Sequence, residues 1–163
     1  VQVIVQALSA DKKFAPDVLG VSAASLAIGL SELPFEEQVA AVRVAVLDGT
    51  PIVCPSYDQV AMADLDLVVA GTENSVCMVE GGAYEVSEET MIQAILAGHE
   101  VIKLLCRAQQ ELVDRCSKPK MVLTPKNAGE AHEKLEATIK EVIFQELYDT
   151  LHTPMVKTEH ARS

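Results

Sequence analysis

Asp58, Asp64 and Asp66 are the carboxylates of this sequence that could gather in one cleft. A divalent-metal site for phosphoryl transfer needs two or more carboxylate oxygens that converge on one ion. Asp64 and Asp66 are two positions apart, so they share a face if a strand has already begun there. The alternative is that all three are solvated residues at the entrance of a strand, where carboxylates are common. The spacing alone leaves both interpretations open.

Other side chains that could perform chemistry occur without partners. No histidine lies at ligand spacing from a second histidine or a cysteine, so we expect exposed helical histidines. Gly81-Gly82 comes between a strand and a helix, but neither a Walker lysine nor a GxGxxG pattern accompanies it. The sequence also contains no nucleophile elbow and no HExxH motif. The histidines are His99, His132, His152 and His160.

The cysteines include no CxxC pair and lie in apolar or helical surroundings. We therefore expect buried, reduced thiols rather than disulfides or a zinc site. They are Cys54, Cys77, Cys106 and Cys116.

Four strands are expected in the middle of the chain, where they must position these residues. Apolar runs at 67–70 and 76–79 are separated by turn residues, which predicts two adjacent antiparallel strands. Residues 39–47 and 51–55 flank Asp48-Gly49, the best hairpin signal in the sequence. In the first of these strands Val42, Val44 and Val46 alternate with Arg43, so Arg43 should face away from the valines.

The chain begins with what we expect to be another, mostly buried strand. Val1, Val3 and Val5 alternate there, with Ile4 and Leu8 between and beyond them. An exposed turn at 11–13 should follow.

A helix is then expected to start at Pro16, with Asp17 beside the positive end of its dipole. Its predicted buried stripe is Leu19, Ala23, Leu26 and Leu30, and its many small residues should allow a close approach to the sheet.

A long helix covers the sheet in this interpretation. Ser87 should cap it, with Glu88 and Glu89 favourable in its first turn. Gly98 should mark a close crossing. Residues 57–63 form a short helix or turn, and another amphipathic helix runs from about residue 130 until Pro154 stops or kinks it. The expected stripe of the long helix is Met91, Ile95, Ile102, Leu105 and Leu112.

Composition and charge limit the possible functions. The chain has 163 residues, is 49% apolar without tryptophan, and carries a net charge of −11. Such a composition belongs to a folded, soluble protein. A chain this acidic is a poor candidate for tight RNA or DNA binding by itself. No apolar run is long enough to span a bilayer, and no signal peptide is visible.

Together these patterns predict an α/β (α+β) fold, with a mixed or antiparallel sheet packed by helices and then a helical segment. We place a domain boundary after residue 118, which gives domains 1–118 and 119–163. Both ends look cut, so we expect a segment of a longer protein. Such a segment should expose a sheet edge and apolar faces and should therefore oligomerise or be poorly soluble.

Four stretches in this order resemble the polynucleotide phosphorylase family of RNase PH-like proteins. The resemblance covers the C-terminal half of that family's first RNase PH-like core, roughly residues 1–116, and residues 130–163 are similar to the start of its helical linker domain. The stretches are residues 8–11 with 17–19, residues 41–44 with 47–49, residues 65–72, and residues 78–80 with 87–89.

The resemblance implies a part of a phosphorolytic 3′–5′ exoribonuclease of RNA degradation. That family uses Mg²⁺ or Mn²⁺, RNA and inorganic phosphate and forms a ring-shaped homotrimer. The catalytic copy of the core carries an aspartate six residues before a second one, and a lysine two positions after that. Here the second aspartate matches Asp66, but the other positions are Val60 and Val68. The resemblance therefore implies a structural copy without catalytic, cofactor-binding or metal-binding residues, since the other core copy binds the metal.

The expected setting is the cytoplasm of a bacterial-type cell, or an organellar matrix. The remaining domains of the same chain are the expected partners, without a membrane. Two alternatives stay open: a catalytic RNase PH-like subunit that uses Asp64 and Asp66, or an unrelated acidic α/β interaction module.

Overall fold

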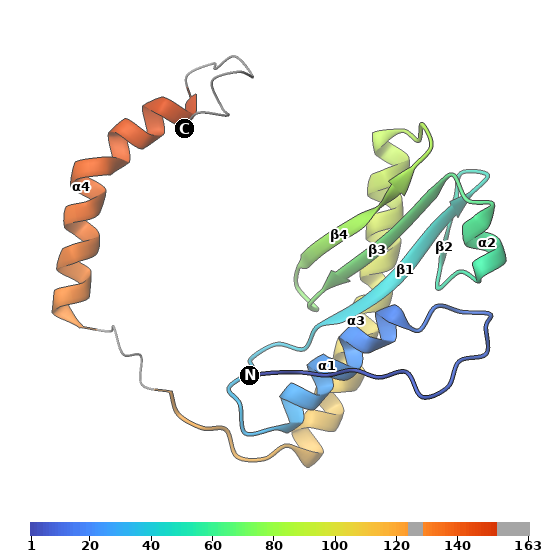
Figure 1. Cartoon of the computed structure of the whole chain (residues 1–163), viewed down its shortest axis with the longest axis horizontal. Helices are drawn as coiled ribbons and strands as arrows, with labels where there is room; N and C mark the ends of the chain where they lie inside the picture. Colours follow the sequence, from blue (N-terminus) through green and yellow to red (C-terminus); the bar gives the residue numbers. More distant parts are fainter. Residues whose placement is uncertain (124–128, 153–163) are drawn as a thin grey trace. The chain divides into compact units, whose positions relative to one another are not determined.

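The computed structural model describes residues 1–123 and 129–152 (Figure 1). Contacts divide the chain into two compact units, Val1–Val122 and Leu123–Ser163, and each is described by itself. The boundary expected after residue 118 stays a prediction.

The first unit is built on a four-stranded antiparallel sheet, as expected (Figure 1). The strands lie in the order β2-β1-β3-β4. Their bounds are β1 Ala40–Leu47, β2 Thr50–Val53, β3 Leu65–Gly71 and β4 Val76–Ala83.

The predicted hairpin joins β1 to β2. Leu47 pairs with Thr50, so the turn consists of Asp48 and Gly49, with φ angles of 49° and 73°. Two positive φ values in succession define the type I′ turn that matches the twist of paired strands. Asp-Gly suits this turn because glycine adopts positive φ without steric cost and aspartate tolerates it.

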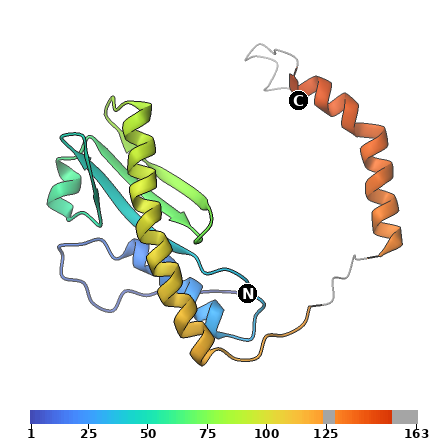
Figure 2. The same ribbon diagram turned by 180° about the vertical axis from the view of Figure 1, so that it is seen from behind.

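Helix α3, Glu88–Cys116, crosses one face of the sheet (Figure 2). Ser87 caps it as predicted, because its hydroxyl accepts a hydrogen bond from the Thr90 N–H at 3.1 Å. Of the predicted stripe, Ile102 is fully buried while Leu112 is exposed. The line of buried residues is Ala94, Gly98, Ile102, Cys106, Gln109 and Val113.

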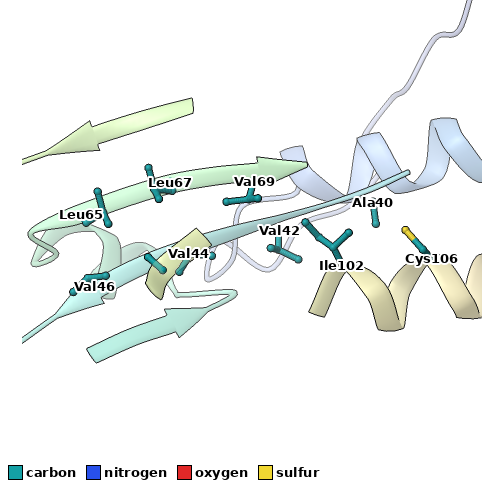
Figure 3. Close-up of a cluster of buried hydrophobic side chains, with 10 residues drawn as sticks. Ala40, Val42, Val44, Val46, Leu65, Leu67, Val69, Ile102 and Cys106 are labelled. Atoms are coloured by element: carbon teal, nitrogen blue, oxygen red, sulfur yellow. The ribbon is translucent and has the colours of Figure 1, made fainter. Parts of the chain in front are cut away.

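The core lies between α3 and the two central strands. Alternate residues of β1 and β3 point into it, and Ile102 and Cys106 of α3 lie over them (Figure 3). The close crossing predicted at Gly98 is confirmed, since a methyl group there would lie 2.9 Å from Val44 Cγ2. The strand residues in the core are Ala40, Val42, Val44, Val46, Leu65, Leu67 and Val69.

Helix α1, Asp17–Leu30, packs against the opposite side of β1, but not through the predicted stripe. Its buried residues are Val18, Ser25 and Gly29, whereas Leu19 is exposed. The reason is close packing: a methyl group at Gly29 would lie within 2.9 Å of Val113 and of the Gln38 amide. The small side of the helix therefore faces inward, and Pro16 is the N-cap rather than the first helical residue.

The prediction of a buried first strand is wrong for this structure. Residues 1–10 form no strand, and Val1, Val3 and Val5 are exposed. A strand is stabilised by hydrogen bonds to a neighbouring strand, and no strand in the described part of the chain pairs with this segment. It passes α1 instead, where a methyl group at Gly20 would lie 3.4 Å from Val5 Cγ1. The turn at 11–13 is present, because Asp11 accepts hydrogen bonds from the Lys13 and Phe14 N–H groups.

The segment that leaves α3 is tied to the end of α1. The Lys120 ammonium donates to the carbonyls of Gly29 and Ser31 at 2.5 and 2.8 Å. The Lys118 N–H donates to the Leu30 carbonyl, and the Met121 N–H donates to the Glu32 carbonyl. The bonds to Gly29 and Leu30 satisfy carbonyls in the last turn of α1 that the helix itself leaves unpaired.

The second unit contains the expected amphipathic helix, α4, Glu130–His152. Lys140 and Glu136 lie one turn apart and form an ion pair at 2.8 Å that stabilises this helix. The expected effect of Pro154 falls outside the described residues. Within the described ranges, no helix combines the length and the apolar character that crossing a bilayer requires.

Candidate functional site

Arg43, Asp66 and Asp17 form a charged cluster on the face of the sheet that α3 does not cover. Arg43 Nη1 donates to Asp66 Oδ2 at 2.6 Å, and Nη2 donates to Asp17 Oδ2 at 2.7 Å. One guanidinium therefore joins α1, β1 and β3 through two charge-assisted hydrogen bonds.

The strand pattern explains this arrangement. Because side chains alternate along β1, Arg43 faces away from Val42 and Val44, as predicted. The register pairs Arg43 with Val68 and Ala45 with Asp66. Arg43 and Asp66 are therefore diagonal neighbours on one face, within reach of a long side chain. The first turn of α1 then brings Asp17 to the second amino group.

Partial burial strengthens these ion pairs. The side chains of Arg43, Asp66 and Asp17 are 22%, 33% and 51% exposed. Burial lowers the pKa of Arg43, but the Asp17 hydrogen bond and the charges of Asp66 and Asp17 outweigh this, so the pKa is raised. Burial likewise raises the pKa of Asp17, but hydrogen bonds from Arg43 and the Val18 N–H outweigh it, and the pKa is lowered. Arg43 and Asp17 therefore stay charged at neutral pH.

Two atoms of the cluster keep unused hydrogen-bonding capacity. Asp66 Oδ1 and Arg43 Nε are buried and have no partner among the described residues. A cavity of about 360 Å³ adjoins them, and Val68, Glu80 and Gly81 also line it. The cluster is thus an ion-pair network beside a small cavity, and the residues that line this cavity include no nucleophile and no histidine that could act as a general base.

The structure does not assemble the predicted carboxylates into a metal centre. Asp58 lies on α2, Tyr57–Ala61, and Asp64 precedes β3, where its carbonyl accepts a hydrogen bond from the Tyr84 N–H. In the described part of the chain, no group of three or more His, Cys, Asp or Glu side chains could hold a metal ion.

The Mg²⁺ or Mn²⁺ implied by the family resemblance does not fit the residues present here. Val60 on α2 and Val68 on β3 offer no ligand atom, and Asp66 is already engaged by Arg43. A divalent ion of this kind needs about six oxygen ligands.

The other candidate residues have structural positions. His99 Nε2 lies 3.1 Å from the Thr72 carbonyl, whereas His132 and His152 are exposed on α4. His160 lies outside the described residues. Gly81 lies very close to the neighbouring strand β3, since a methyl group at this position would lie 2.1 Å from the Asp66 carbonyl oxygen. This contact, rather than phosphate binding, requires a glycine at that position.

The cysteines are free, as expected, but the prediction that they are buried is wrong for three of them. Cys106 is buried, and burial raises the pKa of its thiol, which donates to the Gln38 carbonyl at 3.3 Å. Cys54 follows β2, Cys77 lies on the exposed strand β4, and Cys116 ends α3, so all three face solvent. Apolar sequence neighbours did not predict burial because these positions lie at element ends or on an edge strand.

Sequence reasoning missed the Arg43–Asp17 contact. The pairing of Arg43 with a carboxylate could have been sought, because an arginine in a strand of buried valines needs a counter-ion. The identity of Asp17 as that partner depends on the packing of α1, which no local pattern encodes.

Comparisons with known proteins agree with this fold. Residues 37–101 match the family model described as "3' exoribonuclease family, domain 2". A solved archaeal exosome core aligns over 48% of this chain and 32% of its own, at 15% identity and a TM-score of 0.42, which is too weak a likeness to carry an argument.

Sequence relatives cover more of the chain. The polyribonucleotide nucleotidyltransferase of Sulfurihydrogenibium azorense is 40% identical over 94% of this chain and 25% of that protein. Those of Persephonella marina and Chloroflexus aggregans are 43% and 46% identical over 89% and 77% of this chain. The chain covers 20% and 17% of these two proteins, so it spans a quarter or less of the length of all three relatives. Residues 37–101 therefore form an RNase PH C-terminal domain, and the chain is homologous over most of its length to a segment of polyribonucleotide nucleotidyltransferases.

Proposed function

We propose that the chain is a structural segment of a polyribonucleotide nucleotidyltransferase that degrades RNA by phosphorolysis from the 3′ end. In this reaction inorganic phosphate attacks the terminal phosphodiester and releases a nucleoside diphosphate. The observation that carries the proposal is the identity of 40% over 94% of the chain with a protein of that name. The domain match to residues 37–101 supports it independently.

Within that enzyme we assign this segment no catalytic step. The Arg43 ion pairs engage Asp66 and Asp17, and Val60 and Val68 supply neither a ligand nor a phosphate-binding cation. The Mg²⁺ or Mn²⁺ of the reaction is then bound by the second core copy, elsewhere in the polypeptide.

The acidity of the segment fits a supporting role. With a net charge of −11 it has no excess of cations to neutralise RNA phosphates, so other domains supply the RNA contacts. We propose that it forms part of the wall of a homotrimeric ring in the cytoplasm. The exposed strand β4 and the apolar residues left uncovered on α4 are consistent with a segment that the remaining domains complete.

The decisive experiment changes Asp66 to asparagine in the whole polypeptide that contains this segment. Release of nucleoside diphosphate from RNA and phosphate is then measured per assembled enzyme, with the assembled fraction taken from size-exclusion chromatography. We expect a rate close to that of the unmodified enzyme. Asp58→Asn is the matched control, because it makes the same chemical change at an exposed carboxylate on α2.

The two alternatives predict different results. If Asp64 and Asp66 were catalytic, Asp66→Asn should lower the rate about 100-fold or more while assembly is retained. If the chain were part of an acidic interaction module, the unmodified polypeptide itself would release no nucleoside diphosphate.

A further inference from the structure

The mismatch between the metal that the family's catalytic core uses and the residues present here has a specific cause in the structure. We infer that Arg43 is an internal counter-ion that takes the place of a divalent cation at Asp66 and so keeps metal out of this domain. The inference goes beyond the proposed function, since it concerns what holds the site closed rather than the reaction of the enzyme.

Arg43 occupies one oxygen of each carboxylate. The guanidinium directs separate N–H groups at Asp66 and Asp17, at 2.6 and 2.7 Å, and in each carboxylate it uses the Oδ2 atom. A metal ion at these oxygens would have to share them with the guanidinium or displace it. The planar group is held by the strand register, which places Arg43 diagonally beside Asp66.

The charges of the cluster also disfavour a divalent ion while Arg43 is present. Two carboxylates and one guanidinium leave a net charge of −1, whereas a divalent ion between the carboxylates would bring it to zero without Arg43. With Arg43 in place, an added divalent ion would be a second cation beside a guanidinium that is only 22% exposed. Like charges at short range in such a setting repel strongly.

Few side-chain oxygens remain for a cation while Arg43 is present. Asp66 Oδ1 has no partner in the described residues, and Glu80 lines the same cavity, so one or two oxygens could still accept a cation. The other lining residues near Asp66, namely Val18, Val21, Val68 and Gly81, carry no side-chain oxygen. Water can complete the six ligands of such an ion, but with Oδ2 of Asp66 and of Asp17 bonded to Arg43 only these oxygens remain to anchor it. Removal of Arg43 would free two further carboxylate oxygens, and only then would a cation gain a usable site.

The consequence is that α1 is joined to the sheet without a metal. The bridge from Asp17 through Arg43 to Asp66 consists entirely of this chain's own side chains. The packing of this unit should therefore be independent of the supply of Mg²⁺ or Mn²⁺.

The test measures Mn²⁺ binding to the 163-residue chain by electron paramagnetic resonance of the free ion. Four proteins are compared: the unmodified chain, Arg43→Met, Arg43→Lys and the double variant Arg43→Met with Asp66→Asn. We expect no specific binding to the unmodified chain, and one Mn²⁺ bound by Arg43→Met with a dissociation constant at or below about 1 mM. Arg43→Lys should bind none because it keeps the positive charge, and the double variant should lose the site.

Two results would overturn the inference. One is Mn²⁺ binding by the unmodified chain that Asp66→Asn abolishes. The other is an Arg43→Met protein, folded by circular dichroism, that binds no more Mn²⁺ than the double variant.

If Arg43→Met does not fold, thermal unfolding of the unmodified chain and of Asp66→Asn decides instead. The unmodified chain should unfold at the same temperature in excess EDTA and in MnCl₂, while Asp66→Asn should lower that temperature equally in both. If MnCl₂ raises the unfolding temperature of the unmodified chain but not that of Asp66→Asn, a metal rather than Arg43 occupies the site. None of these measurements involves RNA or phosphate, so this inference and the proposed function can fail separately.

Discussion

Replacing Gly98 with alanine tests how closely α3 crosses the sheet. The new methyl group would lie 2.9 Å from Val44 Cγ2, 3.3 Å from Val42 Cγ2 and 3.6 Å from Val69 Cβ. Carbon atoms in contact prefer separations of about 3.5–4.0 Å, so at least one neighbour must move. Val42 and Val44 are fully buried in the central strand and have branched, stiff side chains, which leaves them little room.

Two effects of opposite sign set the magnitude. Overpacking of a well-filled core costs about 1–3 kcal/mol of unfolding free energy. Alanine in place of glycine within a helix raises the unfolding free energy by about 1 kcal/mol through its higher helix propensity. We therefore expect Gly98→Ala to lower the unfolding free energy by about 0–2 kcal/mol.

Gly20→Ala is the matched control, because it makes the same substitution inside α1. Its methyl group would meet Val5 Cγ1 at 3.4 Å, an ordinary contact, so only the propensity gain of about 1 kcal/mol should remain. The two variants should then differ by about 1–3 kcal/mol in urea unfolding followed by far-ultraviolet circular dichroism. Equal stabilisation by both substitutions would refute the close crossing.

Three further substitutions test the packing, the cap and the ion pairs. Ile102→Ala removes a fully buried side chain and should cost about 2–5 kcal/mol in urea unfolding, whereas a loss below 1 kcal/mol would contradict the core described here. Ser87→Ala should cost about 1 kcal/mol because the Thr90 N–H loses its acceptor, and amide hydrogen exchange in the first turn of α3 should accelerate. Because the pKa of Asp17 is lowered on folding, its contribution is present above about pH 4 and lost as the pH falls through the folded-state pKa. Asp17→Asn should therefore reduce the loss of thermal stability between neutral and acidic pH. The effect should be under about 1 kcal/mol because the Asp17 side chain is half exposed. An unchanged dependence of stability on pH would argue against the Arg43 pairing.

Local chemistry made much of the fold predictable from sequence. Asp48-Gly49 specified the turn between β1 and β2, because few other residues tolerate its two positive φ angles. Ser87 and the two glutamates after it marked the start of α3, and Gly98 marked its closest approach to the sheet. Each of these signals depends only on residues next to one another in the chain or on one repeating pattern.

The incorrect predictions depend on contacts between distant segments. Which side of α1 faces inward is decided by how Gly29 fits against Gln38 and Val113, not by the spacing of its leucines. The valines at the start of the chain have strand character, but a strand forms only where a neighbour is available to pair. Likewise, the sequence placed Arg43 on the correct face but could not show that Asp17 completes its ion pairs.

The attachment of Lys120 to α1 has a mechanical consequence. Tension applied to the chain beyond Val122 would first meet the hydrogen bonds that Lys118, Lys120 and Met121 make with residues 29–32. These bonds would transmit the force to α1, and only after they break would it reach the last turn of α3. A pull on this segment would thus be felt first at the C-terminal end of α1, before it reaches α3.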